Sequence, residues 1–587
     1  MHVIATAGHV DHGKSALVRA LTGIEPDRWD EERRRGLTID LGYAWTTLPS
    51  GEQVAFVDVP GHQRFIGNML AGVGPTSAVL FVVAADEGWR RQSQEHLAAV
   101  DALGISHGLL VVTRSDLADP APALLDARDR LSATSLGDVE SVAVSARTGA
   151  GMTELTDALV RLVVRLPPAR PGDRVRLWVD RAFSIRGSGT VVTGTLSRGG
   201  ISIGDELQVG NRRARVRGLE SLGQPRDRVL PVARVAVNLR GVAVSDVARG
   251  DLLLTPDAWR MTSVLDVRMG GQSSGDLPNH LTLHAGTAAV AVHVRPLGDD
   301  TVRLTLSMPL PLVAGDRLIL RDAGAQRIIG GALVLDADPP ELRRRGAAAR
   351  RGAELASATG VPELLSEVER RGAMLVADAA ALGIPDSSDD AKVLKRGTWL
   401  VSGSALHRWA DALIACVQQQ AAAEPLEPSL TTEAARLAAG VPDRTLLPDV
   451  VERAGLELHQ GRVWLPGVRA AMGAAERGLQ ELEARLQQAP FAAPEQPDLA
   501  AAGLGPREVA AAVRSGRLLR LSDGVLLAPD APAKAMRVLA GLAQPFTLSE
   551  ARQALDTTRR VAVPLLEHLD GRGWTRRVDG THRVVVR

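Results

Sequence analysis

The sequence predicts a multidomain chain: an α/β P-loop nucleotide-binding domain, two β-barrels, and then an all-α/winged-helix (α+β) tandem array. Three observations lead to this fold class. A glycine-rich loop follows an apolar strand and opens a helix within residues 2–21, and short strands with Gly turns fill about residues 173–343. Gly-centred hairpins then recur in an Ala- and Leu-rich C-terminal third. At 587 residues the chain is too long for one core, and the length prior gives about four domains.

Composition narrows the class of protein. A net charge of only +1 argues against a wholly basic nucleic-acid coat, although a local patch remains possible. The single cysteine, Cys416, excludes an internal disulfide framework and a cysteine-rich zinc site. The N-terminus lacks the charged and apolar regions of a signal peptide, and no apolar run reaches the roughly 18 residues of a membrane span. We therefore expect a soluble, cytoplasmic protein.

Residues 8–15, GHVDHGKS, match the pattern G-x-x-x-x-G-K-[ST] between a strand at His2–Ala7 and a helix at Lys14–Leu21. In such a loop the backbone N–H groups cradle phosphates, the lysine reaches the β- and γ-phosphates, and the hydroxyl faces Mg²⁺. Lys14 is one of four lysines among 69 basic residues, so composition alone does not explain it. The pattern predicts that phosphates are bound by Asp11, His12, Gly13, Lys14, Ser15 and Ala16.

Two later motifs supply the metal and the γ-phosphate end of the site. The segment Gly36-Leu37-Thr38-Ile39 offers the Thr38 hydroxyl to Mg²⁺. After a strand at Val54–Val57, the run Asp58-Val59-Pro60-Gly61-His62 offers a carboxylate to the metal shell and a glycine that can approach a γ-phosphate. We expect Mg²⁺ near Ser15, Thr38 and Asp58, and phosphate contact at Gly61.

Two more motifs indicate that the base is guanine. Thr113-Arg114-Ser115-Asp116 follows a strand at Leu109–Val112, and the Asp116 carboxylate can accept both N–H donors of a guanine edge. Ser145-Ala146-Arg147 follows a strand at Val142–Val144 and would close over the base. All five motifs occur in a workable order, each at the end of an apolar strand, which predicts a GTPase that hydrolyses GTP to GDP and phosphate.

The segments GHVDHGK, RGLTID and DVPGHQRF resemble the phosphate loop, first switch and second switch of the translational GTPases, the family of elongation factor Tu. The resemblance implies that His62 is the catalytic residue that orients the attacking water, behind an apolar gate of Val10 and Leu37. It also implies that Asp58 meets Mg²⁺ through a water. One departure stands out: Thr113 and Arg114 replace the usual Asn and Lys, and we expect the shorter Thr113 to weaken the tether on the phosphate loop.

A proline-rich linker separates the GTP-binding domain, residues 1–170, from the predicted barrels at 173–256 and 258–343. The first barrel resembles the second domain of translational GTPases, whose pocket holds the aminoacyl end of a tRNA. The short first switch within residues 22–45 looks like that of the selenocysteine-specific elongation factors (the SelB type). A selenol is ionised near neutrality, so this resemblance implies a cationic pocket; the candidates are Arg181 and Arg234, oriented by Asp180.

Four hairpin signatures follow, centred on Gly397, Gly461, Gly524 and Gly580 at spacings of 56–64 residues. A recurring helix–helix–hairpin unit indicates an array of small domains. We place four winged helices at 344–423, 424–470, 471–531 and 532–587, a number that the selenocysteine-specific factors also carry.

The last unit is the most basic. Residues 534–587 hold ten Lys or Arg against five Asp or Glu. A helix that begins near Arg559 and Arg560 buries Val561, Leu565 and Leu569, with Pro564 in its first turns or at a kink. Exposed arginines on a helix start and a wing suit an RNA hairpin. The candidates for binding a hairpin of the message are Arg559, Arg560, Arg572, Arg576 and Arg577.

These resemblances imply a monomeric, GTP-dependent carrier of selenocysteinyl-tRNA. It would deliver this tRNA to the ribosome at a recoded UGA codon, tethered by its last winged helix to an mRNA hairpin, the selenocysteine insertion element. Ribosome-stimulated GTP hydrolysis would release the tRNA. Two alternatives stay open: another tRNA-carrying translational GTPase, such as an initiator type, or a regulatory GTPase whose winged-helix arm binds DNA or protein.

Overall fold

The computed structural model describes residues 1–26, 38–62, 65–167, 174–185, 189–385, 392–468 and 472–586. The chain divides into two compact units. The first unit comprises Met1–Glu367 with Met374–Asp390, and the second comprises Val368–Ala373 with Ala391–Arg587. In the described part of the chain, no helix has the length and apolar character needed to cross a membrane.

The N-terminal domain is built on a six-stranded sheet of order β2-β3-β1-β4-β5-β6, parallel except for β2. Helices α3, α4 and α5 pack on one face of the sheet, and α1 and α6 pack on the other. The apolar runs of the sequence become these buried strands, as expected for a parallel sheet covered on both faces. The elements are β1 (His2–Ala7), α1 (Lys14–Thr22), β2 (Gly42–Thr47), β3 (Gln53–Asp58), α3 (Ile66–Val73), β4 (Ala78–Ala84), α4 (Arg91–Ala102), β5 (Gly108–Thr113), α5 (Ala121–Ser132), β6 (Glu140–Ala143) and α6 (Met152–Arg165).

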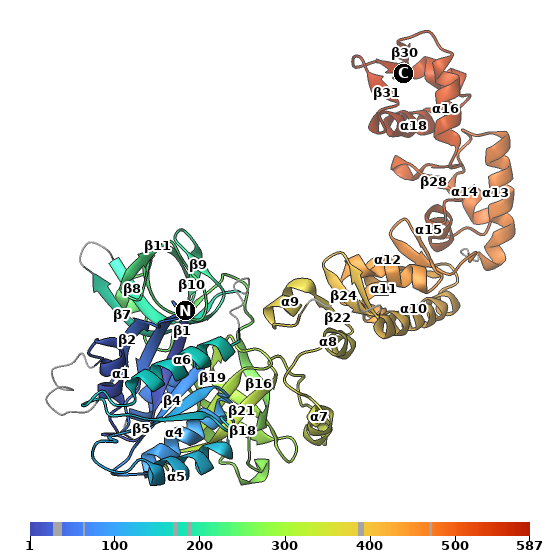
Figure 1. The fold of residues 1–587 in the computed structure, drawn as a ribbon. Coiled ribbons are helices and arrows are strands. Elements are labelled where there is room, and N and C mark those ends of the chain that lie inside the picture. Colours follow the sequence, from blue (N-terminus) through green and yellow to red (C-terminus); the bar gives the residue numbers. More distant parts are fainter. Residues whose placement is uncertain are drawn as a thin grey trace. The chain divides into compact units, whose positions relative to one another are not determined.

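Two closed barrels follow, drawn mainly in green in Figure 1. In barrel II the order β10-β15-β7-β8-β14-β11 closes through the β10–β11 pairing, with β12 added beside β11 and with β9 paired to β13. Its strands are β7 (Arg176–Ile185), β8 (Gly189–Arg198), β9 (Ile201–Ser202), β10 (Glu206–Val209), β11 (Arg212–Ser221), β12 (Gln224–Arg226), β13 (Arg228–Val229), β14 (Ala233–Arg240) and β15 (Leu252–Leu254).

Barrel III closes in the order β16-β19-β18-β17-β20-β21. Its strands are β16 (Thr262–Met269), β17 (His280–Ala285), β18 (Ala288–Pro296), β19 (Thr301–Leu310), β20 (Arg317–Asp322) and β21 (Arg327–Asp336). A buried ion pair joins the two barrels, because Arg176 Nη1 on β7 lies 2.6 Å from the Asp316 carboxylate before β20. Beyond barrel III come α7 (Ala347–Leu355), α8 (Leu364–Arg371), β22 (Ala373–Leu375) and α9 (Val376–Ala381).

The second unit consists of short helices and small antiparallel sheets. All four hairpins expected from the glycine signatures are present, as β23–β24, β26–β27, β28–β29 and β31–β32. The fold class predicted from the sequence is therefore confirmed. The elements are β23 (Val393–Arg396), β24 (Trp399–Ser402), α10 (Gly403–Ala423), β25 (Ser429–Thr431), α11 (Thr432–Ala439), α12 (Leu447–Arg453), β26 (Glu457–His459), β27 (Arg462–Trp464), α13 (Glu476–Gln488), α14 (Gln496–Ala501), α15 (Pro506–Arg514), β28 (Leu519–Arg520), β29 (Leu526–Leu527), α16 (Ala531–Ala540), β30 (Phe546–Thr547), α17 (Leu548–Ala554), α18 (Arg559–Gly571), β31 (Thr575–Arg577) and β32 (His582–Val585).

Candidate functional site

The phosphate loop joins β1 to α1 and holds Lys14 in place through its own backbone. Lys14 is buried, and its Nζ donates to the carbonyl oxygens of His9 at 2.7 Å and Gly8 at 3.2 Å. Gly8 has φ +134°, and a Cβ there would lie 2.1 Å from the Val82 carbonyl oxygen, so only glycine fits. Lys14, Ser15 and Ala16 form the first turn of α1, where backbone N–H groups lack helical partners and can bind an anion.

Three predicted metal ligands converge beside this helix start. Ser15 Oγ lies 3.0 Å from Thr38 Oγ1 and donates to the Asp58 carboxylate at 2.6 Å. Thr6 Oγ1 on β1 donates to the other Asp58 oxygen at 2.7 Å, which fixes the carboxylate. Hydroxyl and carboxylate oxygens next to a phosphate loop are the hard ligands that Mg²⁺ prefers. The donor set thus fits Mg²⁺, with Ser15, Thr38 and Asp58 as the residues that would hold it.

The second switch lies directly against the phosphate loop. A Cβ on Gly61 would lie 2.4 Å from Val10 N and 2.7 Å from Lys14 Nζ, so a side chain here would displace the lysine. The backbone N–H of Val10 donates to Gln92 Oε1 at 3.0 Å. His62 follows Gly61 and is exposed, with its ring centroid 6.0 Å from that of Phe65. Leu37, the predicted partner of Val10 in the gate, lies outside the described residues.

Two buried histidines lie at the phosphate loop: His96 contacts it from α4, and His12 is part of it. The backbone N–H of Gly8 donates to His96 Nδ1 at 3.1 Å, and burial lowers the pKa of His96 to about 3. His12 is also fully buried, with its Nε2 3.9 Å from a Glu87 carboxylate oxygen, and burial lowers its pKa to about 4. Both rings are neutral at physiological pH, so Lys14 provides the positive charge at this end of the loop.

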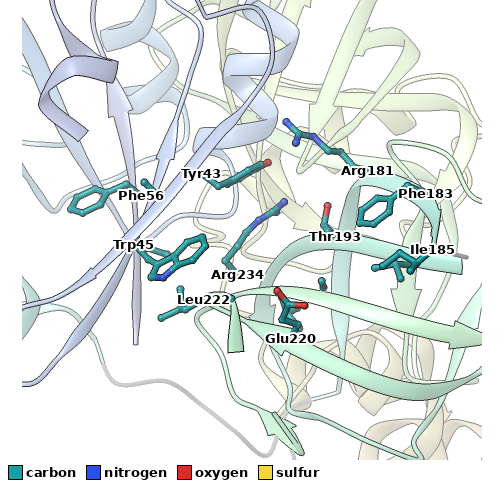
Figure 2. Close-up of a pocket in the computed structure, with 16 residues that line it drawn as sticks. Tyr43, Trp45, Phe56, Arg181, Phe183, Ile185, Thr193, Glu220, Leu222 and Arg234 are labelled. Atoms are coloured by element: carbon teal, nitrogen blue, oxygen red, sulfur yellow. The ribbon is translucent and has the colours of Figure 1, made fainter. Parts of the chain in front are cut away.

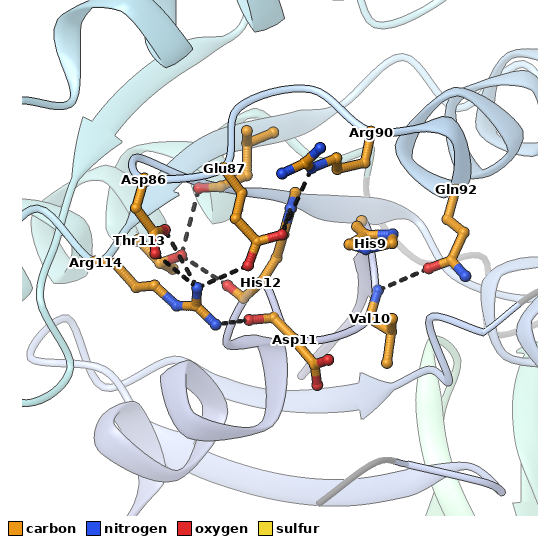
Figure 3. Close-up of polar contacts among 12 residues, drawn as sticks. His9, Val10, Asp11, His12, Asp86, Glu87, Arg90, Gln92, Thr113 and Arg114 are labelled. Atoms are coloured by element: carbon orange, nitrogen blue, oxygen red, sulfur yellow. Dashed lines mark hydrogen bonds and ion pairs between the residues drawn. The ribbon is translucent and has the colours of Figure 1, made fainter. Parts of the chain in front are cut away.

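On the base side, Thr113 and Arg114 both contact the phosphate loop. The Thr113 hydroxyl donates to the His12 carbonyl oxygen at 2.7 Å, so the shorter side chain still ties this strand end to the phosphate loop (Figure 3). Arg114 donates to the Asp11 carbonyl oxygen and pairs with Asp86 at 3.0 Å and Glu87 at 2.9 Å. Its guanidinium therefore bridges the phosphate loop and the end of β4.

The carboxylate predicted to read guanine lies at the same sheet edge. Arg147 contacts Asp116 Oδ2 through Nε at 2.9 Å and Nη2 at 2.7 Å. Hydrogen bonding from Ser145, and then from Arg147, lowers the pKa of Asp116, so this group is ionised and able to accept N–H donors. Ser145 is buried, and Ala146 is half-buried beside it. Of the predicted guanine residues, Ser145 and Arg147 therefore meet at the Asp116 carboxylate, whereas Thr113 and Arg114 contact the phosphate loop.

A second site lies between barrel II and the N-terminal domain, in a cavity of about 340 Å³ that we call the cationic pocket (Figure 2). Arg234 on β14 pairs with both carboxylate oxygens of Asp180 on β7, and its guanidinium stacks 3.8 Å from the Tyr43 ring centroid. Burial by itself would lower the pKa of Arg234, but the Asp180 charge and Tyr43 raise it overall. The lining includes Tyr43, Trp45, Arg181, Phe183, Leu222 and Arg234.

The geometry around Asp180 differs in part from the expectation. Asp180 accepts from Arg234 at 2.9 Å and from Thr193 at 2.6 Å, so it does orient one of the two predicted arginines. Arg181 instead contacts the Asp40 carboxylate at 3.0 Å and donates to the Leu41 carbonyl oxygen. Asp40 is the last residue of the first-switch segment RGLTID and Tyr43 follows on β2, and neither had been singled out as a pocket residue.

In the second unit, all five arginines proposed for RNA are exposed, and two of them also form ion pairs. Arg559, Arg572 and Arg576 are exposed at the two ends of α18 and on β31, with Arg572 lying 5.5 Å from the Trp574 ring centroid. Arg560 pairs with Glu495 at 3.8 Å, and Arg577 pairs with Glu567 at 3.5 Å.

Helix α18 itself matches the expectation of a buried apolar face. Val561, Leu565 and Leu569 are buried, and Pro564 lies in the second turn of a helix that continues to Gly571. The helix is therefore held by its apolar face while its ends present charge.

Sequence patterns missed several residues that touch the predicted site. Asp86 and Glu87 follow β4 at the same carboxyl edge of the sheet as the known motifs, and this position was a usable signal. Gln92 and His96 project from α4, and Thr6 lies inside β1, so only the folded chain reveals their contacts.

This arrangement is that of a P-loop GTPase, because a lysine at a helix start is suited to phosphates and an ionised aspartate at the same sheet edge is suited to the N–H donors of a base. The family model described as "Elongation factor Tu GTP binding domain" matches residues 1–165. Two further models match: "Selenocysteine-specific elongation factor, beta-barrel domain" over residues 277–341, and "Elongation factor SelB, winged helix" over residues 537–584.

Full-length relatives agree. The chain is 31% identical to a selenocysteine-specific elongation factor of Desulfomicrobium baculatum, covering 99% of each chain. It is 30% identical to the selenocysteine-specific elongation factor of Escherichia coli K12, over 99% of this chain and 98% of that one. The crystal structure of a bacterial selenocysteine-specific elongation factor, EF-Sec, superposes with a TM-score of 0.79 at 25% identity, covering all of both chains. The chain belongs to the family of selenocysteine-specific elongation factors, and it is a translational GTPase.

Proposed function

We propose that this protein binds GTP and selenocysteinyl-tRNA and delivers the tRNA to the ribosome at a recoded UGA codon. In this proposal it acts as a cytoplasmic monomer, and its last winged helix holds an mRNA hairpin, the selenocysteine insertion element. The observation that carries the proposal is the cationic pocket, whose two arginines face a cavity of about 340 Å³ in the barrel next to the GTPase domain. Family membership adds support for the overall role.

The pocket chemistry favours an anionic aminoacyl group. A selenolate carries negative charge near neutrality, whereas the hydroxyl of a seryl group is neutral. A guanidinium provides five N–H donors, and Asp180 and Asp40 occupy only part of this capacity in Arg234 and Arg181. Charge-assisted hydrogen bonds are roughly twice as strong as neutral ones, so the pocket would prefer the selenolate over the hydroxyl.

At the nucleotide site, the chain's own groups would position GTP and water. Lys14 and the N–H groups at the start of α1 would hold the β- and γ-phosphates, and Asp116 would accept the guanine N–H donors. Mg²⁺, held by Ser15 and Thr38 with Asp58 behind them, would neutralise phosphate charge. His62, next to Gly61, would orient the attacking water when the ribosome stimulates hydrolysis, with Val10 and Leu37 in front of it. Loss of the γ-phosphate would then release the tRNA.

The proposed arm explains how a rare factor can compete at a single codon. Tethering to the message raises the local concentration of the carrier without any new contact at the decoding site. The domain limits proposed for the four winged helices are 344–423, 424–470, 471–531 and 532–587. All five candidates for the hairpin are exposed, and two of them, Arg560 and Arg577, also pair with Glu495 and Glu567.

Filter binding in the GTP form tests the aminoacyl proposal. Wild-type protein should bind selenocysteinyl-tRNA at least about tenfold more tightly than seryl-tRNA on the same tRNA body, since one charged hydrogen bond contributes about 1.5–3 kcal/mol. Arg181→Met should reduce this ratio, whereas Arg213→Met, which removes an exposed arginine of barrel II paired with Glu206, should not. Equal affinity of wild-type protein for the two tRNAs would refute the proposal.

A separate binding experiment tests the arm. Removing residues 534–587 should abolish hairpin binding and spare GTP binding, but Phe491, Leu521 and Val525 share a core with this segment, so point variants are cleaner. The triple variant Arg559→Ala, Arg572→Ala, Arg576→Ala should lose affinity for the hairpin downstream of a UGA codon and show a shallower salt dependence. Arg537→Ala, on exposed α16, is the control. Unchanged affinity of the triple variant would reject these contacts.

A further inference from the structure

The end of the first switch, from Thr38 to Asp40, connects the nucleotide site to the cationic pocket. Thr38 lies at the metal end of the nucleotide site, with its hydroxyl 3.0 Å from Ser15 Oγ. Asp40 comes two residues later, and two extended residues span at most about 7 Å. The position of Thr38 therefore confines Asp40 to within about 7 Å of it, so moving Thr38 away from the metal site changes where Asp40 can lie.

Asp40 contacts barrel II through arginines. Its carboxylate lies 3.0 Å from Arg181 Nη2 and 3.6 Å from Arg249 Nη1. The neighbouring Leu41 carbonyl oxygen accepts a hydrogen bond from the same Nη2 of Arg181. These contacts use one nitrogen of Arg181, which leaves Nε and Nη1 of a side chain that lines the cavity as donors for a ligand.

The two pocket arginines are therefore held in different ways. Arg234 is held by Asp180, which belongs to the same barrel and takes further hydrogen bonds from Thr193 at 2.6 Å and Tyr43 at 3.3 Å. Arg181 is held by a carboxylate that belongs to the GTPase domain and lies at the end of the first switch. The Asp180 carboxylate stays with barrel II wherever the switch lies, whereas the position of Asp40 depends on the switch.

We propose that Asp40 is a positioning residue that makes the orientation of Arg181, and with it the acceptance of a selenolate, depend on the bound nucleotide. This inference rests on the proposed function. With Thr38 at the metal site, Asp40 fixes the Nη2 end of Arg181 and aims its remaining donors into the pocket. When the γ-phosphate is lost and Thr38 leaves Ser15, Arg181 loses its support while Arg234 keeps Asp180.

This coupling must act in both directions. If GTP favours selenocysteinyl-tRNA through Asp40, then selenocysteinyl-tRNA must favour GTP by the same factor. Coupling between two sites is commonly 5–150-fold, and one ion pair accounts for the lower part of that range. The exchange of Asp40 for asparagine keeps the shape of the side chain and removes its charge.

The test compares Asp40→Asn with wild-type protein in two measurements: the affinity for tRNA in each nucleotide form, and the dissociation of nucleotide in the presence of tRNA. In the GTP form, Asp40→Asn should weaken binding of selenocysteinyl-tRNA by about 5–10-fold and leave seryl-tRNA affinity unchanged. In the GDP form the affinity for both tRNAs should be unchanged. Saturating selenocysteinyl-tRNA should slow dissociation of a fluorescent N-methylanthraniloyl-GTP from wild-type protein, and this slowing should be about 5–10-fold smaller in the variant.

Matched variants separate this role from a general loss of structure. Asp257→Asn removes an exposed carboxylate of barrel II that pairs with Arg213 at 2.6 Å, and it should behave as wild type. Asp40→Glu keeps the charge and should restore most of the tRNA effect on nucleotide dissociation. A misfolded variant would lose affinity for seryl-tRNA and for the labelled GTP as well.

Several outcomes would overturn the inference. Asp40→Asn could bind selenocysteinyl-tRNA more tightly, which would make Asp40 a competitor of the ligand. It could also leave the GTP-to-GDP affinity ratio intact, which would remove Asp40 from the coupling. A wild-type protein that does not distinguish selenocysteinyl-tRNA from seryl-tRNA would instead refute the proposed function itself, so the two failures are distinguishable.

Discussion

The nucleotide site takes its groups from the carboxyl edge of one sheet, whereas the cationic pocket takes its groups from two domains. At the nucleotide site, Lys14 is held by carbonyl oxygens of its own loop, and Gly61 approaches that loop within the distance that only a glycine allows. In the pocket, Arg234 and Arg181 are held by the carboxylates of Asp180 and Asp40.

This difference shows how each site can respond to a ligand. A site held by backbone is present before the ligand binds, since the carbonyl oxygens that hold Lys14 belong to the same loop. A site held by ion pairs depends on each partner staying in place, and one of these partners lies at the end of a switch. We therefore expect the nucleotide site to keep its geometry without a ligand, and the geometry of the cationic pocket to depend on the position of the first switch.

The largest effect is expected for Arg234→Met. The change leaves the Asp180 carboxylate, 5% exposed, without its cation. Breaking a buried ion pair by removing one partner costs about 3–5 kcal/mol. Amide hydrogen exchange in β7, β8 and β14 should accelerate accordingly, and Arg181→Met, at a side chain 22% exposed, should accelerate it less. Equal acceleration of exchange by the two variants would contradict the difference we infer between the Asp180–Arg234 and Asp40–Arg181 ion pairs.

Lys14→Ala should come next and should act on binding alone. Truncation of one partner of a buried, hydrogen-bonded charge pair costs about 2–5 kcal/mol, and each 1.4 kcal/mol is tenfold in affinity. Equilibrium titration with labelled GTP measures the loss, and Lys534→Ala, which removes a half-buried lysine of α16 paired with Asp530, is the control. A loss of selenocysteinyl-tRNA affinity in the absence of nucleotide would contradict the separation of the two sites.

Acid should weaken the nucleotide domain through its buried histidines. The folded-state pKa values of His12 and His96, about 4 and about 3, lie below the unfolded value near 6.5. Their contribution to stability is therefore complete above pH 6.5 and is lost as the pH falls toward these values, by about 1.4 kcal/mol per pH unit for each histidine. Urea unfolding at pH 7 and pH 5 should show a smaller pH dependence for His12→Gln. An unchanged dependence would mean that the His12 ring is not held neutral.

The smallest effect is expected for Thr113→Ala. It removes the hydrogen bond to the His12 carbonyl oxygen, which contributes about 0.5–1.5 kcal/mol. Labelled GTP should dissociate up to about tenfold faster. Thr113→Ser keeps the hydroxyl and should behave nearly as wild type. If both variants match wild type, the tether at the base side does not support the loop.

Much of the nucleotide site could be predicted because its motifs lie at the ends of parallel strands. Ser15, Thr38 and Asp58 were expected together from motif order, and their oxygens do converge. Contacts that depend on side-chain reach across elements were not predicted: Gln92 from α4 meets Val10, and Thr113 reaches His12 despite its short side chain.

The sequence by itself determined the fold class and the GTPase motifs, because strand periodicity, glycine turns and residue chemistry are local properties, and its family resemblance singled out the two arginines that line the pocket. The tertiary structure alone decided what holds each arginine. Arg181 meets Asp40 across 141 positions of the chain, and Arg234 stacks on Tyr43 across a domain boundary. Such pairings depend on how barrel II packs against the GTPase domain, and no local pattern encodes that packing.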